Sequence, residues 1–258
     1  MRRIITAVLL MLALSACTSI SYEFGQIAGA GARFGDRDPH QWKSRTPWSY
    51  PVHGTDVAKY QNRVNWPKLR EQGLAFAFVK ATEGGDRFDE RFEENWAGAR
   101  RAGIPRGAYH FYYFCRPAIE QAAWYINHVP KERSSLPPVL DMEWNPASPS
   151  CKLRPDPETV RSEMKVFLDA VAEHYGKKPI IYTTIDFFED NDLARFRHYP
   201  FWLRSVAGHP DDKYRGLPWT FWQYTGTGIV PGISGDADLN TFNGDAGDWR
   251  KWLSANTT

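Results

Sequence analysis

Short apolar runs alternate with helix-like patterns along most of the chain. Near-continuous apolar runs, such as Leu74 to Ala81, are typical of strands buried on both faces of a sheet. Runs of this kind predict five strands, at residues 52–57, 74–81, 107–112, 138–140 and 179–183. Apolar residues spaced three and four positions apart predict helices between them, at residues 67–72, 88–102, 117–129 and 157–175.

The last of these helices has the clearest boundaries. Asp156 is a favourable N-cap, Pro157 suits the first turn, and Gly176 is a favourable stop. The helix before it is defined mainly by its apolar stripe, which predicts that Ile119 faces inward.

The helical signal fades after the fifth strand, where residues 186–196 predict at most a short helix. Three strand-like segments follow, at residues 201–205, 220–224 and 236–240. Five alternating β/α units and three further strands add up to the eight strands of a closed barrel. The pattern therefore predicts an α/β fold over residues 51–258, a modified TIM-like (β/α)5(β)3 barrel of parallel strands.

Polar and titratable residues gather where these strands end, and barrels of this type carry their reactive groups at the C-terminal strand ends. The eighth strand closes against the first, so we expect Asp238 to neighbour Asp56. The residues at or near these ends are Asp56, Lys80, Tyr109, His110, Asp141, Glu143, Tyr182, Gln223 and Asp238. Four carboxylates at one mouth repel each other, which disfavours the arrangement in a protein that has no use for them.

Asp141 and Glu143 are the most informative pair. Because side chains alternate faces along a strand, both acids should point to one side and Met142 to the other. Two like charges about 7 Å apart in a partly dry cleft raise the proton affinity of at least one, as a general acid requires. The alternative is a pair of solvated loop acids, and the clustering of carboxylates disfavours it.

The N-terminus has the pattern of an export signal, with a basic start followed by an apolar run too short to span a bilayer. Leu14-Ser15-Ala16-Cys17 resembles a bacterial lipobox. We therefore expect residues 1–17 to be a lipoprotein signal peptide and Cys17 to carry the lipid. An ordinary signal peptide cleaved elsewhere is the alternative.

Residues 18–50 predict a tether between anchor and domain, which Trp42 or Trp48 would hold against the domain surface. Thr18 follows Cys17 with no acid at that position, which resembles the outer-membrane pattern of lipoproteins in double-membraned bacteria. The expected location is therefore the bacterial cell envelope, anchored in the outer membrane and facing the periplasm.

Composition excludes some functions. The chain has 32 basic and 30 acidic residues, and removal of Arg2 and Arg3 with the signal peptide would leave the two counts equal. A near-neutral chain without a basic stripe has no general attraction for nucleic acid. Aromatic residues make up 15% of the chain. Such rings line sugar-binding clefts, but they also fill cores.

Cysteine and histidine usage adds two expectations. Cys115 and Cys151 remain as an even pair in an exported chain, which predicts a disulfide, with two free buried thiols as the alternative. The histidines are scattered, without the spacing of a metal site, so we expect neither a metal nor a cofactor.

Six short motifs occur in order along the predicted barrel. They begin at Gly54, Phe76, Gly107, Val139, Trp222 and Asp238, and read GTDVAKYQ, FAFVKATEG, GAYHF, VLDME, WQY and DLN. Together these motifs resemble glycoside hydrolase family 25, the Chalaropsis-type lysozymes. The resemblance implies a modified barrel of the kind predicted above. It also implies a monomer that cleaves the β-1,4 bond between N-acetylmuramic acid and N-acetylglucosamine in peptidoglycan glycan strands.

The resemblance also implies roles for individual residues. Glu143 would be the general acid, and Asp141 would be the nucleophile or would steady participation by the acetamido group of the substrate. Asp56 and Asp238 would be supporting acids that tune charge and bind sugar. The weaker candidates for substrate binding are Lys80, Tyr109, His110, Tyr182, Trp202 and Gln223. For His110, the alternative is a rim histidine whose hydrogen bonds are satisfied within the protein. For Tyr182 and Trp202, the alternative is packing within the barrel.

Some positions depart from the family pattern: Ala58 replaces a common Ser, Asn62 a frequent Gly, and Asn65 a frequent Asp. None of them removes a carboxylate with an assigned role. Two other functions stay open, a non-catalytic peptidoglycan-binding envelope lipoprotein and a glycosidase of the same fold that acts on another N-acetylated glycan.

Overall fold

The structure, a computed structural model, describes residues 34–43 and 45–257. The predicted signal peptide with Cys17, and the first part of the predicted tether, lie outside these residues. Among the helices of the described part, none is both long enough and apolar enough to cross a membrane.

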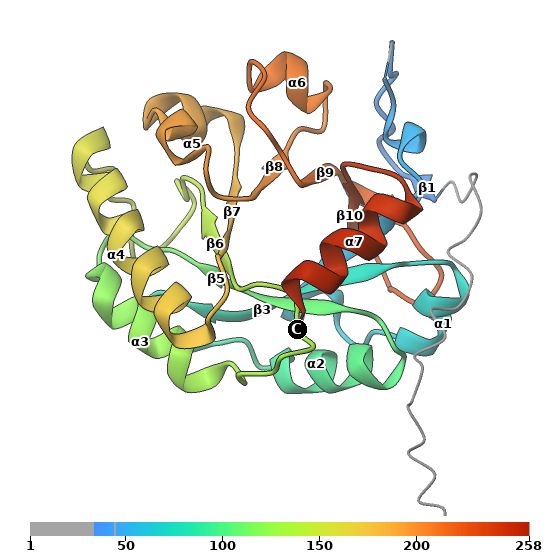
Figure 1. Cartoon of the computed structure of the whole chain (residues 1–258), viewed down its shortest axis with the longest axis horizontal. Coiled ribbons are helices and arrows are strands. Elements are labelled where there is room, and N and C mark those ends of the chain that lie inside the picture. The colour runs from blue at the N-terminus through green and yellow to red at the C-terminus, as the bar shows by residue number, and fades with distance from the viewer. Residues whose placement is uncertain (1–33, 44, 258) are drawn as a thin grey trace, which may run out of the picture.

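A closed barrel of eight strands forms the centre of the molecule (Figure 1). Each strand pairs with the next, and the last pairs with the first, so the barrel has no open edge. The strands are β2 (His53–Val57), β3 (Phe76–Glu83), β5 (Arg106–Phe111), β6 (Val139–Met142), β7 (Ile180–Thr183), β8 (Phe201–Arg204), β9 (Phe221–Ile229) and β10 (Ala237–Phe242). The predicted (β/α)5(β)3 architecture is confirmed.

Strand β10 departs from the predicted parallel order, because it runs antiparallel to both β9 and β2. Only residues 230–236 connect β9 to β10, and a parallel crossover needs a dozen or more residues. The short connection therefore forces the chain to return in the opposite direction. As a result Asp238 reaches the barrel mouth from the start of its strand, where it pairs in register with Asp56 as expected.

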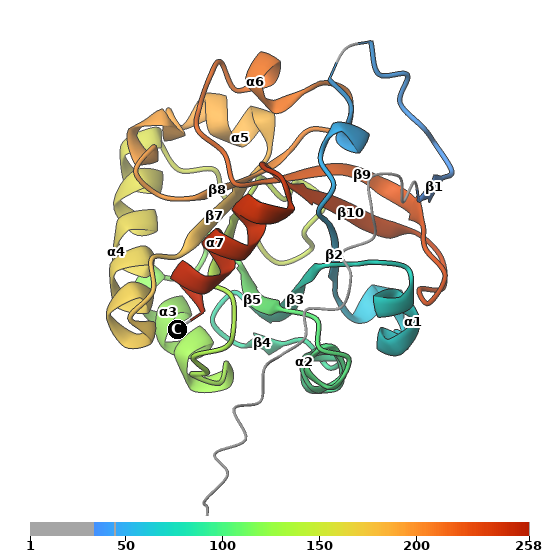
Figure 2. The same ribbon diagram turned by 45° about the vertical axis from the view of Figure 1, so that its right-hand side comes forward.

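Four helices cover the outside of the barrel next to its first strands (Figure 2). They are α1 (Trp66–Glu71), α2 (Phe92–Arg101), α3 (Ala118–His128) and α4 (Pro157–Tyr175). The predicted ends of α4 are confirmed, because the Asp156 carboxylate accepts bonds from two backbone N–H groups and Gly176 takes a left-handed φ of 67°. Between β7 and β9 the helices of the described chain are short, α5 (Ile185–Asp190), a 3-10 turn (Leu193–Phe196) and α6 (Pro210–Lys213).

The barrel interior is closed at one end by a helix that the apolar pattern did not predict, α7 (Ala246–Asn256). Trp249 of this helix packs its ring against Phe76, Phe221 and Phe242, which lie at the end opposite the carboxylates. The helix thus fills the base of the barrel with apolar side chains. A second and larger core lies between the outer face of the barrel and the helices.

The buried face of α3 differs from the prediction. Ile119 is 57% exposed, whereas Gln121 is fully buried. The Gln121 amide accepts a bond from the Tyr113 N–H and donates to the Tyr113 carbonyl, and it also contacts the His110 ring. A buried amide that satisfies backbone groups fixes the rotation of the helix and turns Ile119 outward.

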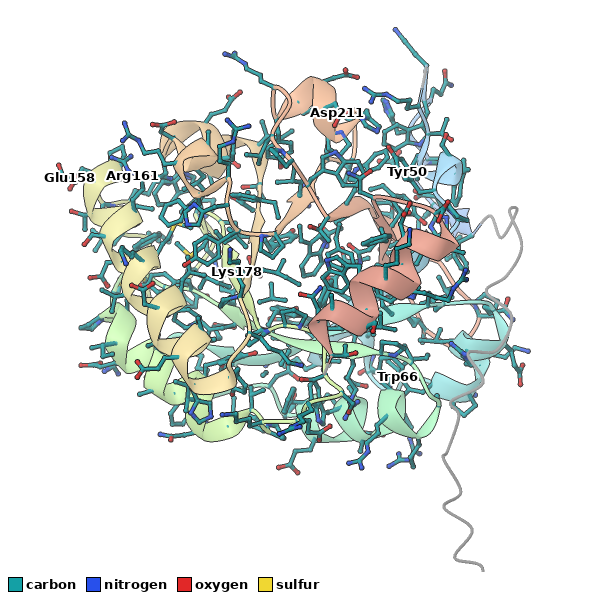
Figure 3. The ribbon with its side chains drawn as sticks, viewed as in Figure 1. Tyr50, Trp66, Glu158, Arg161, Lys178 and Asp211 are labelled. Carbon is teal, nitrogen blue, oxygen red and sulfur yellow. A yellow bond between two sulfur atoms is a disulfide. The ribbon has the colours of Figure 1, made fainter. Side chains whose placement is uncertain are left out.

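Residues 34–43 and 45–50, within the segment expected to be a tether, lie against the barrel. The short strand β1 (Gly35–Asp36) pairs antiparallel with β9. Trp42 and Trp48 pack against the core, and Tyr50 meets the His209 ring nitrogen at 2.8 Å. Figure 3 shows Tyr50 on the same side of the molecule as Asp211 of α6. This segment covers the face of β9 at which the barrel has no long helix.

Cys115 and Cys151 form the predicted disulfide, with their Cα atoms 5.8 Å apart. The bond ties the loop before α3 to the loop before α4. Both loops leave the C-terminal ends of neighbouring strands, so the bond braces the rim that follows Glu143.

We expect the Cys115→Ser/Cys151→Ser variant to lose about 4 kcal/mol of unfolding free energy, because the bond constrains cysteines 36 residues apart in the unfolded chain. Urea denaturation of both proteins under oxidising conditions measures the difference. Wild type treated with a reductant should then unfold like the variant. Equal midpoints without reductant would show that the bond adds no stability.

Asn62 has a φ of 52° and a ψ of −131°, a conformation that favours glycine. This explains why the family pattern has Gly there. We expect Asn62→Gly to raise the unfolding free energy by about 1 kcal/mol and Asn62→Ala to lower it, because only glycine adopts this conformation without strain. Thermal unfolding of the three proteins tests the order, and a Gly variant less stable than wild type would contradict it.

Candidate active site

A cavity of about 350 Å³ opens at the C-terminal ends of the barrel strands. All four predicted catalytic carboxylates line it, and so does every predicted substrate-binding residue except His110. The lining residues are Asp56, Val57, Ala58, Tyr60, Gln61, Lys80, Tyr109, Phe111, Asp141, Glu143, Tyr182, Trp202, Arg204, Gln223 and Asp238. We call this space the catalytic cavity.

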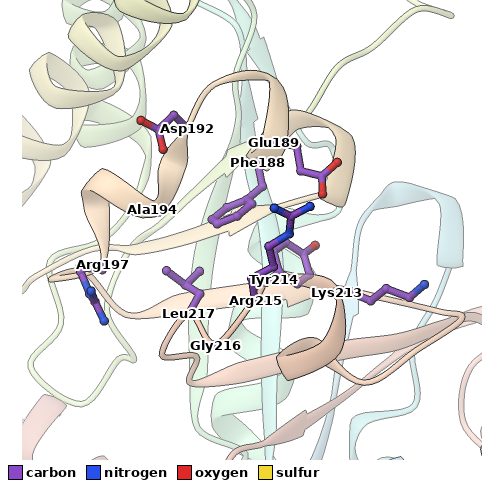
Figure 4. A pocket seen from close by; sticks show the side chains of 10 residues that line it. All are labelled: Phe188, Glu189, Asp192, Ala194, Arg197, Lys213, Tyr214, Arg215, Gly216 and Leu217. Atoms are coloured by element: carbon purple, nitrogen blue, oxygen red, sulfur yellow. The ribbon is translucent and has the colours of Figure 1, made fainter.

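A larger depression, of about 530 Å³, lies between α5, the 3-10 turn and the loop before β9 (Figure 4). No predicted site residue lines it. Figure 4 shows Arg197 and Lys213 at its rim pointing away from each other, while Arg215 points toward Glu189, so the three cations do not converge on a common ligand. The depression therefore lacks the convergent chemistry of the catalytic cavity.

Strand β6 delivers the two central carboxylates to the catalytic cavity. Asp141 and Glu143 both line it, while Met142 between them is fully buried in the core beneath the helices. The alternation predicted from the sequence is confirmed. Asp141 is not a solvated loop residue, since it is only 6% exposed, and Glu143, directly after the strand, is partly buried.

Burial and mutual repulsion shift the proton affinities of this pair. Burial raises the pKa of Glu143 to about 7, although the positive charge of Arg204 partly opposes the shift. Burial, together with the negative charge of Glu143, raises the pKa of Asp141 well above its usual range. The buried Oδ1 atom of Asp141 has no hydrogen-bond partner within the described part of the chain. The pair can thus retain a proton near neutral pH and offers an unused acceptor to a ligand.

Two side-chain amides hold Asp56. Gln223 donates to both carboxylate oxygens, at 3.0 and 3.2 Å, and Asn240 donates at 2.7 Å. Each amide oxygen accepts a bond in turn, from the Tyr182 hydroxyl at 2.9 Å and from the Trp202 indole N–H at 2.7 Å. These bonds turn both amide N–H groups toward Asp56, which favours its carboxylate form.

Burial raises the pKa of Asp56 to about 6, and the bonds from Asn240 and Gln223 limit the rise. Among the described residues, no comparable set of donors reaches the Asp238 carboxylate. Burial, followed by the charge of Asp56, raises the pKa of Asp238 well above its usual range.

Arg204 is the cation that sequence reasoning missed. It lines the catalytic cavity, and its charge lowers the pKa values of Asp56, Glu143 and Asp238 against the effect of burial. None of the described carboxylates lies within ion-pair distance of its guanidinium. Arg204 lies two residues after Trp202 on β8, and Asn240 lies two residues after Asp238 on β10, so strand alternation was the signal for both.

Lys80 reaches the rim of the cavity from β3. It forms a buried ion pair with Glu83 at 2.7 Å, and its ammonium lies 4.8 Å from the centre of the Phe111 ring. Because Glu83 already holds the ammonium, Lys80 shapes the wall more than it adds a free charge.

His110 does not belong to the catalytic cavity, contrary to the prediction. It is fully buried on the helix side of β5, where its Nδ1 lies 2.8 Å from the Thr82 hydroxyl and its ring stacks on Phe167. Its neighbours on the strand, Tyr109 and Phe111, face the cavity instead. Since side chains alternate along a strand, all three could not face one side.

The residues described in the structure contain no group of three or more His, Cys, Asp and Glu side chains that could hold a metal ion.

Comparison with known proteins identifies the family. Residues 55–233 match the family described as Glycosyl hydrolases family 25. The chain belongs to this family. It is therefore a glycoside hydrolase.

Several relatives support the assignment to family 25. Lysozyme M1 of Streptomyces globisporus is 35% identical, over 76% of this chain and 69% of that protein. Protein YegX of Escherichia coli (strain K12) is 36% identical, over 82% of this chain and 76% of its own length. The structure of a family 25 glycosyl hydrolase from Bacillus anthracis superposes with a TM-score of 0.73 at 33% identity, and the match covers 84% of this chain and 98% of that one.

We expect Glu143 to titrate near pH 7, and to titrate at a higher pH in the Arg204→Gln variant, because the guanidinium charge lowers the pKa of this carboxyl group. Carbon NMR of protein labelled at the Glu carboxyl carbons measures both titrations. Arg204→Lys keeps the positive charge, so it should titrate close to wild type. A Gln variant that titrates at or below the wild-type pH would contradict this electrostatic role.

Proposed function

We propose that this chain is a muramidase, which cleaves the β-1,4 bond between N-acetylmuramic acid and N-acetylglucosamine in peptidoglycan. The observation that carries the proposal is the pair of buried carboxyl groups, Asp141 and Glu143, which face one cavity and hold a proton near neutral pH. The resemblance to a named lysozyme supports the choice of substrate.

Glu143 acts as the general acid in this proposal. Its pKa of about 7 leaves much of it protonated at neutral pH, so it can give its proton to the leaving glycosidic oxygen. With the proton of the pair on Glu143, Asp141 is the negative member, and its charge stabilises the positive charge that develops on the sugar. Proton release from Glu143 and charge stabilisation by Asp141 thus occur together.

Asp141 can take either of two roles. Its carboxylate attacks the anomeric carbon, or it accepts a hydrogen bond from the acetamido N–H of the substrate while the acetamido oxygen attacks. The unpartnered Oδ1 atom is suited to the second role, because it has no competing donor in the described part of the protein. Asp56, whose carboxylate form two amide donors favour, adds negative charge around the developing cation, and Asp238 beside it is a further polar group that can bind sugar.

Aromatic side chains suit the cavity to a glycan. Tyr60 is 71% exposed at the rim and presents its ring face, whereas Tyr182 and Trp202 are buried within the wall. Flat rings bind the apolar faces of sugar rings. The buried tyrosine and tryptophan also orient the amides that hold Asp56, so they combine packing with site support.

The proposed location is the bacterial cell envelope. Cys17 carries the lipid that anchors the protein in the outer membrane, and the barrel faces the periplasm. The motif ending at Cys17 supports this, and the disulfide suits an oxidising compartment. A tether attached to a fixed surface would raise the local concentration of the barrel at the wall.

We expect Glu143→Gln to lower the rate of muropeptide release from purified peptidoglycan by about 10³-fold, because the amide cannot donate the proton that the leaving oxygen needs. Product masses and reducing-end analysis give the rate and the bond cleaved. Glu189→Gln, at the exposed depression of Figure 4, is the matched control and should retain wild-type activity.

Products that end in reducing muramic acid, from wild type and control alone, would support the muramidase proposal. Products that end in reducing glucosamine would overturn the choice of bond. If no protein releases products while all sediment with the wall, the chain is a peptidoglycan-binding protein and the proposal is wrong.

A further inference from the structure

A second cavity, of about 570 Å³, adjoins the catalytic cavity. Arg204 lines both spaces. Gly226 lies on the boundary, since a Cβ atom there would come within 3.2 Å of the Asp238 carboxylate. We call this second space the side pocket. Its lining residues are Asp36, Asp38, Pro39, His40, Gln41, Arg204, Val206, Ala207, Tyr224, Thr225, Gly226 and Thr227.

The N-terminal segment forms the outer wall of the side pocket. At one end it is tied to β9, where the Arg37 N–H donates to the Thr227 carbonyl at 2.9 Å and the Thr227 hydroxyl donates to Asp36 at 2.6 Å. At the other end the Trp42 ring packs edge-on against Trp222, with centroids 5.1 Å apart. Residues 38–41 span these two attachments and enclose the pocket. This wall precedes residues 55–233, which match the family.

The lining chemistry differs from that of the catalytic cavity. Asp36 and Asp38 bring negative charge, and Arg204 brings a positive charge that no described carboxylate pairs. The tyrosine of the lining, Tyr224, is only 3% exposed, so it offers no ring face for a sugar. A pocket with both charge signs and no sugar platform suits a ligand that carries both an ammonium and carboxylate groups.

Peptidoglycan carries such a ligand next to the bond that a muramidase cleaves. A short peptide stem is joined to the lactyl group of muramic acid, and it has free carboxylates and a free amine. We propose that the side pocket binds the peptide stem of the muramoyl residue held in the catalytic cavity. Arg204 donates to a stem carbonyl or carboxylate, and Asp38 accepts from the stem amine. This inference rests on the proposed muramidase function and adds a second recognition element to it.

Blocking the side pocket tests the inference. Ala207 is an exposed lining residue outside the carboxylate cluster, so Ala207→Trp would fill the pocket and leave the catalytic cavity unchanged. The substrates are intact peptidoglycan and the same glycan strands after an amidase has removed the stems. We expect Ala207→Trp to lower kcat/KM on intact peptidoglycan by about tenfold, and on stem-free strands by less than about twofold.

The matched control is Ala194→Trp, an equally exposed alanine at the separate depression of Figure 4. It should change neither rate. Equal losses on both substrates with Ala207→Trp, or no loss on either, would overturn the stem-binding inference and leave the muramidase proposal standing. A wild type that cleaves neither substrate would instead overturn the muramidase proposal, and the inference with it.

The charge of the pocket has its own test. We expect wild type to cleave peptidoglycan with free stem amines about fivefold faster than the same material after N-acetylation, and Asp38→Asn to lose this preference. Asp38 is exposed, and its side chain makes no ion pair with a described residue, so the substitution spares the fold. If Asp38→Asn still prefers peptidoglycan with free stem amines, the Asp38 carboxylate does not bind the stem amine.

Discussion

Closure of the barrel by β10 against β2 is the constraint on which the rest of the structure depends. The pairing joins the first and last barrel strands and brings Asp238 opposite Asp56. Without it, both strands would expose unpaired backbone groups, and the aromatic interior would face water. The same pairing also completes the ring of strand ends from which the catalytic cavity is built.

The electrostatic arrangement at the mouth is costly by itself. Four carboxylates lie in one buried site with Arg204 as a neighbouring unpaired cation among the described residues. The two amides from β9 and β10 offset part of the cost at Asp56, because they donate to it and are themselves oriented by bonds from the barrel wall. From the described part of the chain, no such donor reaches Asp141 Oδ1. The protein therefore solvates one acid internally and leaves another ready for a ligand, which is typical of a site selected for function over stability.

Much of the fold could be predicted from local chemistry. Apolar runs predicted the barrel strands, and the cap at Asp156 and stop at Gly176 predicted α4, because these signals depend on nearby residues alone. The direction of β10 and the role of α7 depend on connection length and on the space left at the barrel base. The prediction that Ile119 on α3 faces inward was wrong. The hydrogen bonds of the buried Gln121 amide fix the rotation of the helix more strongly than its apolar stripe does.

The site residues, too, were predictable where local signals place them and not where the whole fold does. Alternation along β6 predicted the placement of Asp141 and Glu143 correctly, and the same rule along β5 would have excluded His110 once Tyr109 was assigned to the cavity. Arg204 was not predicted as a site residue, because a single arginine in a strand belongs to no motif. Its role becomes visible only together with the acids that surround it. Contact of Trp42 or Trp48 with the domain surface was expected from the sequence, and both pack against the core. The side pocket that this segment encloses was not predicted, because the segment has little periodicity.

The helix that plugs the base of the barrel has a consequence for how the chain reaches its native state. Trp249 is among the last residues of the sequence, yet its ring contacts Phe76 near the start of the barrel. The first strand must likewise wait for the last one, since the Thr55 hydroxyl bonds to the backbone of Asp238, 183 residues further along. Contacts of such long sequence separation slow folding. A chain that is synthesised from its N-terminus therefore cannot close its barrel until nearly all of it has been made. Before that point the unfolded chain can still pass through a narrow channel.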